Sequence, residues 1–280
     1  EALANYKALI QYLPYHFEAH FNKGLLHLDL GQYRAAVATF TKAAEMAGGE
    51  RKAKAQYSLG MAYRELGDTA RAKAAFITAI RLRPDYLAPR FGLASLEPDT
   101  REGRERALER YETILSLAPD YAPALFNVAL IHSAEGRMRK AESAYRRALQ
   151  YNPEYLKARY NLGLLMLEQE RAADARAEFK RILRRHPDHV ESHFNLARAA
   201  YAEKDYKSAL RGYARAIEFK NGDYPEAYLN LGLTHVRLDN YAEAENAYNR
   251  AIALSADYPE AWYNLGLAQM EQKNWSAAAE

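Results

Sequence analysis

A repeat of 34 to 36 residues runs along the chain and constrains its fold more than any other feature. Eight alanines are each followed four positions later by an aromatic residue: Ala2 and Tyr6, Ala36 and Phe40, Ala72 and Phe76, Ala107 and Tyr111, Ala141 and Tyr145, Ala175 and Phe179, Ala209 and Tyr213, Ala244 and Tyr248. This interval places both side chains on one face of an α-helix. A unit this short cannot bury that face alone, so neighbouring units must stack into one elongated core.

A small residue precedes each of these pairs in most copies and indicates a second helix per unit. The small residues are Gly24, Gly60, Ala129, Gly163, Ala197, Gly232 and Gly266. A missing or minimal side chain lets the next helix approach closely. Prolines twelve residues after the alanine end several of the units: Pro14, Pro84, Pro119, Pro153 and Pro187. Only 14 glycines and 10 prolines in 280 residues argue against a large all-β fold.

The pattern resembles the tetratricopeptide repeat family, whose motif of about 34 residues folds as a helix–turn–helix. The clearest match runs from Tyr224 to Gly266, and the resemblance covers essentially the whole chain. It implies an all-α fold, an α-solenoid in which antiparallel helix pairs form a right-handed superhelix. We expect a single array over 1–280: a partial second helix at 1–16, full repeats at 17–52, 53–87, 88–121, 122–155, 156–189, 190–224 and 225–258, and a truncated repeat at 259–280. Because such arrays need capped ends, we expect the natural protein to continue on one or both sides, or a partner to cover the ends.

The copy at 88–121 departs from the pattern. Its first helix meets Pro98, which a helix rarely passes, and Asp99–Thr100 then forms a candidate N-cap. The sequence therefore predicts a shortened first helix and a local change in superhelical twist near 96–103.

An asparagine stands two positions before the small residue in six copies: Asn22, Asn127, Asn161, Asn195, Asn230 and Asn264. The resemblance places first helices on the concave face of the array, and it implies an asparagine ladder like that of peptide-binding arrays in this family. One amide can pair with both backbone groups of an extended peptide residue. The alternative is that asparagine is favoured here for local hydrogen bonds between helices.

Mostly apolar residues follow the asparagines along the same helical face. The candidate partner-binding set adds Leu130, Leu164, Leu167, Tyr201, Leu233 and Leu267, with Arg198 interrupting the row. If they face the groove they form an exposed apolar patch, which tends to be an interaction site. The alternative, that they pack within the superhelix, stays open. One variant of the family binds carboxylates with lysines at set positions of its first helices. This chain lacks those lysines, because most of the positions hold Phe, Tyr or Leu, for example Phe126, Phe194 and Leu229.

Charge is distributed unevenly. Residues 136–220 hold 19 Lys and Arg against 11 Asp and Glu, whereas acidic residues dominate 225–280. Much of the basic excess falls on second helices, which the resemblance places outward, so it is either a docking face for an acidic partner or a solvated surface with intrahelical ion pairs. A net charge of +3 with no binding module does not favour nucleic acid. No apolar run is long enough to span a membrane.

The chain carries none of the motifs that mark catalysis or a resident cofactor. It has no cysteine, no phosphate-binding glycine loop, no H-E-x-x-H and no G-x-S-x-G. His16 and His20, and His189 and His193, have the spacing of metal ligands on a helix, but these positions hold aromatic residues in other copies, so packing explains them. We expect no enzyme activity, no cofactor and no metal.

The leading functional hypothesis is a non-catalytic scaffold that binds a peptide or protein segment in its concave groove and helps assemble a larger complex. Two alternatives rest on analogy with other arrays of the family. One is the substrate-recruiting arm of a larger enzyme, such as a protein O-glycosyltransferase. The other is a component of bacterial envelope assembly or export. The sequence leaves the compartment open between cytoplasm and bacterial periplasm.

Overall fold

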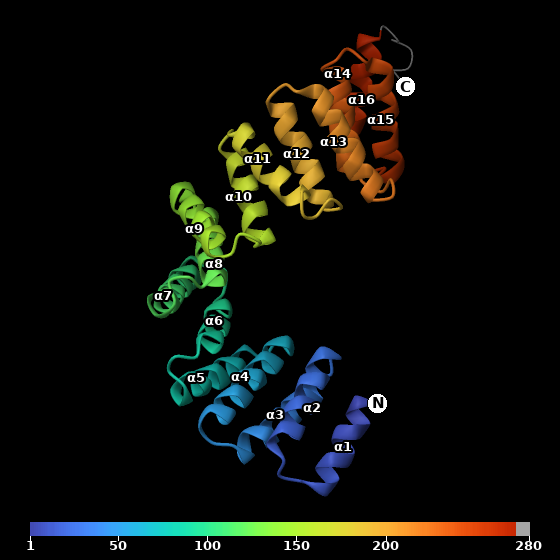
Figure 1. The fold of residues 1–280 in the computed structure, drawn as a ribbon. Coiled ribbons are helices and arrows are strands. Elements are labelled where there is room, and N and C mark those ends of the chain that lie inside the picture. The colour runs from blue at the N-terminus through green and yellow to red at the C-terminus, as the bar shows by residue number, and fades with distance from the viewer. Residues whose placement is uncertain (273–280) are drawn as a thin grey trace. The chain divides into compact units, whose positions relative to one another are not determined.

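The computed structural model describes residues 1–272, and these fold into sixteen α-helices without a strand (Figure 1). The helices are α1 (Ala2–Tyr12), α2 (Phe17–Asp29), α3 (Tyr33–Met46), α4 (Gly49–Glu65), α5 (Thr69–Leu82), α6 (Leu87–Ser95), α7 (Arg101–Leu117), α8 (Ala122–Ala134), α9 (Met138–Tyr151), α10 (Leu156–Glu168), α11 (Ala172–Leu183), α12 (Val190–Ala202), α13 (Tyr206–Phe219), α14 (Pro225–Val236), α15 (Tyr241–Leu254) and α16 (Pro259–Glu271). The fold is an all-α solenoid of stacked helix pairs. Residues 273–280, which end the predicted truncated repeat, lie outside the described part.

The chain forms two compact units, residues 1–136 and residues 137–280. Within each unit every helix packs against the next one in the chain. Among helices that are not consecutive, the strongest contacts in the described part join successive first helices of the repeats: α2 with α4, α4 with α6, α10 with α12, and α14 with α16. First helices of neighbouring repeats therefore contact one another at these four places.

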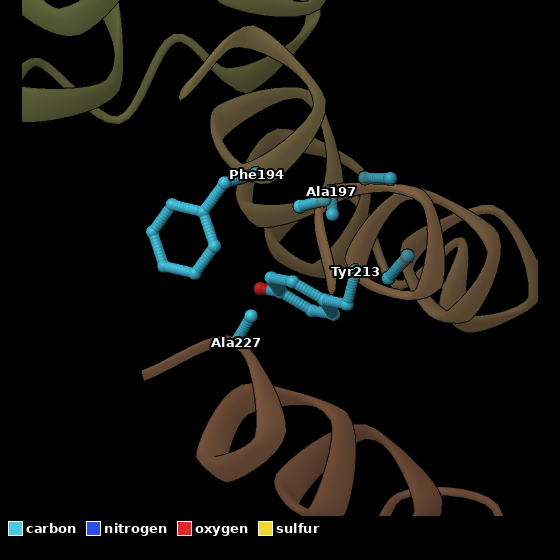
Figure 2. Packing of buried hydrophobic residues seen from close by; sticks show 7 residues of the cluster. Phe194, Ala197, Tyr213 and Ala227 are labelled. Carbon is cyan, nitrogen blue, oxygen red and sulfur yellow. The ribbon is translucent and has the colours of Figure 1, made fainter. Parts of the chain in front are cut away.

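From the second copy onward the repeated alanine and aromatic residues form the core, as the pattern predicts, whereas Ala2 is exposed and Tyr6 is half-buried. In the second unit Phe194, Ala197, Tyr213 and Ala227 are all buried and belong to one cluster drawn from three successive helices (Figure 2). The rings of Phe194 and Tyr213 lie 5.6 Å apart and are tilted by 60°, an arrangement that aromatic pairs favour. Equivalent rings elsewhere, such as Phe40 and Phe179, are completely buried.

The turn between the two helices of a repeat needs one residue with a left-handed backbone. Glycine supplies it at Gly31, Gly67 and Gly136, where φ lies between 68° and 75°. Glu170, Lys204 and Asp239 adopt the same conformation, with φ from 57° to 62°. Because residues other than glycine, asparagine and aspartate rarely adopt this region, the tightness of the helix pair holds Glu170 and Lys204 there.

The predicted shortening in the third repeat is confirmed. Helix α6 has nine residues and ends at Ser95. Thr100 caps the next helix, since its hydroxyl oxygen accepts a hydrogen bond from the N–H of Gly103 at 3.1 Å. The segment between the helices lies so close to α7 that a Cβ on Gly103 would overlap the carbonyl oxygen of Pro98.

Glu97 fixes this irregular segment to the helices on either side. Its carboxylate accepts hydrogen bonds from Arg106 at 3.0 Å and Arg110 at 3.1 Å, both on α7, and lies 3.6 Å from Lys73 on α5. Burial alone would raise the pKa of Glu97, but the three cations outweigh it and lower the pKa below its ordinary value.

We expect Glu97→Gln to lower the free energy of unfolding at neutral pH by about 1–2 kcal/mol, a modest figure because the cations are partly exposed. A carboxyl with a lowered folded pKa stabilises the fold above its unfolded pKa, and this contribution is lost as pH falls through the folded pKa. Urea titrations should therefore show the difference from wild type shrinking once the pH falls below the ordinary glutamate pKa of about 4.3, and vanishing below the lowered pKa of the folded state. Glu109→Gln, at an exposed position on α7, is the control, and an equal loss from both variants would contradict this role for Glu97.

No helix in residues 1–272 combines the length and the apolar character that crossing a bilayer requires.

Candidate functional site

The candidate asparagines share one local geometry. In five of the six, the side-chain Nδ2 donates to the backbone carbonyl oxygen four residues earlier on its own helix: Asn127 to Pro123 (2.8 Å), Asn161 to Lys157 (2.8 Å), Asn195 to Glu191 (2.9 Å), Asn230 to Glu226 (2.8 Å) and Asn264 to Glu260 (2.6 Å). Asn22 is exposed and makes no side-chain hydrogen bond within the described residues. The bond back to the helix restricts each amide to one orientation.

Four of these amides keep binding capacity after making that bond. Asn127, Asn161, Asn230 and Asn264 each have a second N–H and a carbonyl oxygen with no partner among the described residues. One donor and one acceptor on a fixed plane match the C=O and N–H of a peptide residue. The local bonds and a ligand-binding role are therefore compatible.

Asn195 differs from the other five because its hydrogen bonds are used within the protein. It is only 4% exposed. Its second N–H donates to the hydroxyl of Tyr160 on α10 at 3.0 Å, and its Oδ1 accepts from Arg198 at 2.9 Å. Asn195 thus ties α10 to α12 and fixes the guanidinium that interrupts the leucine row.

The apolar row is partly packed and partly exposed. Leu233 packs against the core formed by Ala244, Tyr248, Leu265 and Ala268. Tyr201 packs against the cluster around Phe194 and accepts a hydrogen bond from Arg237 at 3.0 Å. Leu164 and Leu167 on α10 are half-buried, and Leu267 on α16 is 42% exposed.

The first unit carries a different surface. Ser58 and Gly92 occupy the asparagine slot on α4 and α6, so the row there is reduced to Asn22 and Asn127. Asn127 and Leu130 instead line a hollow of about 400 Å³ that also contacts Ser95, Arg104 and Ile131. The hollow lies where α6 ends early. Every first helix of the second unit, α10, α12, α14 and α16, therefore carries an asparagine in this slot, and among these four residues Asn195 is buried.

A hydrogen bond that recurs in five of the repeats was not predicted. The residue two positions before the asparagine slot donates to a backbone carbonyl six residues earlier in the linking loop: His20 to Pro14 (2.9 Å), Arg90 to Pro84 (2.7 Å), Arg159 to Pro153 (2.7 Å), His193 to Pro187 (2.7 Å) and Trp262 to Ala256 (3.1 Å). The sequence did contain a signal for this hydrogen bond. Histidine, arginine and tryptophan occupy the same position of the repeat, and all three side chains carry N–H donors.

The histidines have structural roles in this arrangement. Nδ1 of His16 accepts from the N–H of Ala19, and Nδ1 of His189 accepts from the N–H of Ser192, each at 3.1 Å, so both rings cap helices. Burial lowers the pKa of His235, which favours its neutral form. Within residues 1–272 no three side chains of the His, Asp or Glu type are placed to hold a metal ion.

Family models and solved structures identify the repeat. Three models of the tetratricopeptide repeat match this chain, at residues 132–191 and 166–232, at 100–154 and 229–280, and at 17–49 and 53–86. No curated protein matches it.

Similar solved structures include YrrB, described as a tetratricopeptide repeat protein with an unusual peptide-binding site (23% identity, 68% of this chain and 97% of that one, TM-score 0.61). They also include pilF of Pseudomonas aeruginosa (22% identity, 75% and 94% covered, TM-score 0.61) and a tetratricopeptide repeat protein of Cytophaga hutchinsonii (16% identity, 88% and 99% covered, TM-score 0.69). At these identities the similarity establishes the fold. The repeat pattern, the stacked helix pairs and the matching models together show that this chain belongs to the tetratricopeptide repeat family.

Proposed function

We propose that the chain is a protein–protein interaction scaffold whose second unit binds an extended peptide segment along α10, α12, α14 and α16. The observation that carries the proposal is the set of fixed amides at Asn161, Asn230 and Asn264, each with a free donor and a free acceptor. The repeat is an interaction module, and a peptide-binding site in YrrB is consistent with this use of the fold.

The spacing of the first helices suits such a ligand. Packed helices lie about 8–10 Å apart, and an extended chain advances about 3.3 Å per residue. Asn230 and Asn264 on successive first helices would therefore meet the peptide roughly three residues apart, and Asn161 and Asn230, with the buried Asn195 between them, roughly six residues apart. Because they would bind backbone groups, affinity from the row would not depend on sequence, and specificity would come from neighbours such as Leu164, Arg198 and Leu267.

Asn161→Ala combined with Asn230→Ala tests this proposal. Peptides selected from a random library on the wild-type protein should bind the double variant about 30-fold or more weakly, which corresponds to about 2 kcal/mol from several hydrogen bonds. Thermal unfolding should hardly change, since both residues lie on the surface row. The same peptides carrying N-methyl groups at alternate backbone nitrogens should lose comparable affinity on the wild-type protein.

Two controls separate binding from folding. Asn22→Ala in the first unit should leave affinity unchanged. Asn195→Ala should lower stability, because it removes the tie between α10 and α12. Unchanged affinity of the selected peptides for the double variant would exclude the row as the binding site.

A further inference from the structure

Three adjoining hollows lined by arginine lie in the second unit, apart from the asparagine row. The first, of about 260 Å³, lies between the loop after α9, the start of α10 and the end of α11. The second, of about 370 Å³, shares Arg159 and Arg181 with it, and the third, of about 460 Å³, shares Arg146 and Gln150 with the second. We call their arginines the arginine belt: Arg139, Arg146, Arg147, Arg159, Arg181, Arg184 and Arg185.

The carboxylates in the belt are already bound by cations of the chain. Glu178 is buried and forms ion pairs with Arg159 at 2.8 Å and with Arg181. Glu142 pairs with Arg171 at 2.7 Å and Arg146 at 2.9 Å, and these hydrogen bonds lower its pKa.

Glu154 pairs with Arg185 at 2.9 Å. Arg139, Arg147 and Arg184 have no carboxylate partner among the described residues, so the belt carries uncompensated positive charge.

The belt faces away from the proposed peptide groove. Arg159 and Asn161 are two residues apart on α10. Because two residues of a helix turn by about 200°, their side chains point to nearly opposite sides of α10. The guanidinium of Arg159 is held toward α11 and the preceding loop by its bonds to Glu178 and Pro153. The belt is therefore a second surface that can be occupied independently of the groove.

We propose that the arginine belt binds a glutamate- or aspartate-rich segment of a partner protein. Guanidinium groups pair with carboxylates in two-point geometry, and separate hollows along α9 and α11 suit separate acidic side chains. One feature favours this ligand over nucleic acid: apart from His186, the lining of the three hollows has no ring on which a base could stack.

The test measures binding of a fluorescein-labelled glutamate-rich peptide to the whole chain by fluorescence anisotropy. Arg139→Glu, Arg147→Glu and Arg184→Glu together should weaken binding at least about tenfold, since each exposed pair contributes up to about 1 kcal/mol. Raising the ionic strength should weaken wild-type binding. The Lys versions of the same three substitutions keep the charge and should retain most of the affinity.

The matched control is Lys207→Glu, Arg211→Glu and Arg250→Glu, which changes the net charge equally at exposed positions of α13 and α15. This variant should bind the peptide as the wild type does. An equal loss in both charge-reversal variants, or no loss in either, would overturn the proposal. So would a duplex DNA probe that binds more tightly than the peptide and depends on the same three arginines. Asn161→Ala with Asn230→Ala should leave this binding intact, which distinguishes the belt from the groove.

Discussion

Replacing Gly163 by alanine is expected to lower the free energy of unfolding of the second unit by about 1–3 kcal/mol. Alanine is the better helix former by about 1 kcal/mol, so a loss would have to come from packing. A Cβ at Gly163 would lie 2.8 Å from both Cε1 and Cζ of Phe179. That ring is completely buried, and it cannot move aside without disturbing the core of the next helix pair.

Gly266→Ala is the matched control, because Gly266 occupies the same slot on α16. No described atom lies within 4 Å of a Cβ built there. This variant should gain up to about 1 kcal/mol from helix propensity alone. Urea unfolding followed by far-ultraviolet circular dichroism measures both. If the two substitutions changed stability in the same direction, close packing against the aromatic ring of the facing helix would not explain why glycine recurs at this position of the repeat.

The chain itself contains an alternative solution to this packing problem. Ala197 holds the small slot on α12, and the facing helix α13 carries Gly212 immediately before the aromatic Tyr213. A Cβ on Gly212 would lie 2.7 Å from the Cβ of Ala197. The methyl group of Ala197 on α12 is thus accommodated because Gly212 on α13 has no side chain. Gly163 on α10 instead faces α11, where the buried Glu178 holds the position that Gly212 holds on α13.

The parts of the fold that follow from local pattern were predictable. The repeat of 34 to 36 residues and its recurring small and aromatic residues predicted stacked helix pairs. Pro98 and Thr100 predicted a short α6 and the cap of α7. The turns were less predictable. Glu170 and Lys204 hold positive φ where other copies carry glycine, and this conformation is imposed by packing of the helix pair rather than by the residue.

The candidate site was predictable in position but not in bonding. The spacing of the asparagines showed that they share one face of the first helices. It could not show that Asn195 would be buried, because that depends on Tyr160, 35 residues away on another helix. The role of Arg159 was hidden for the same reason, since its partner Glu178 comes from the next helix.

Alkaline pH should unfold this array steeply because of the tyrosines in its core. Burial raises the pKa of Tyr111 and Tyr145 to about 12, and it also raises the pKa of Tyr213 and Tyr248. These rings stay neutral in the fold, whereas in the unfolded chain they ionise above about pH 10. The folded state then holds more protons, so stability is constant below about pH 10 and falls as pH rises toward the folded pKa. Tyr145, Tyr213 and Tyr248 belong to the second unit, as does Tyr224, whose pKa burial raises to about 12. With four such tyrosines, this unit should lose about 5 kcal/mol per pH unit in this range.

Tyr248→Phe isolates one ring of this group. The Tyr248 hydroxyl is buried and has no hydrogen-bond partner among residues 1–272, and Phe40, Phe76 and Phe179 fill the same slot in other copies. Stability at neutral pH should therefore stay equal or rise by about 1 kcal/mol, and the alkaline slope should fall by about 1.4 kcal/mol per pH unit. Urea unfolding across alkaline pH, combined with tyrosinate absorbance, measures both quantities. Tyr12→Phe, at a side chain that is 83% exposed, should change neither. A lower stability of Tyr248→Phe at neutral pH would mean that the hydroxyl contributes to the fold, and an unchanged alkaline slope would mean that its burial is not a source of the alkaline instability.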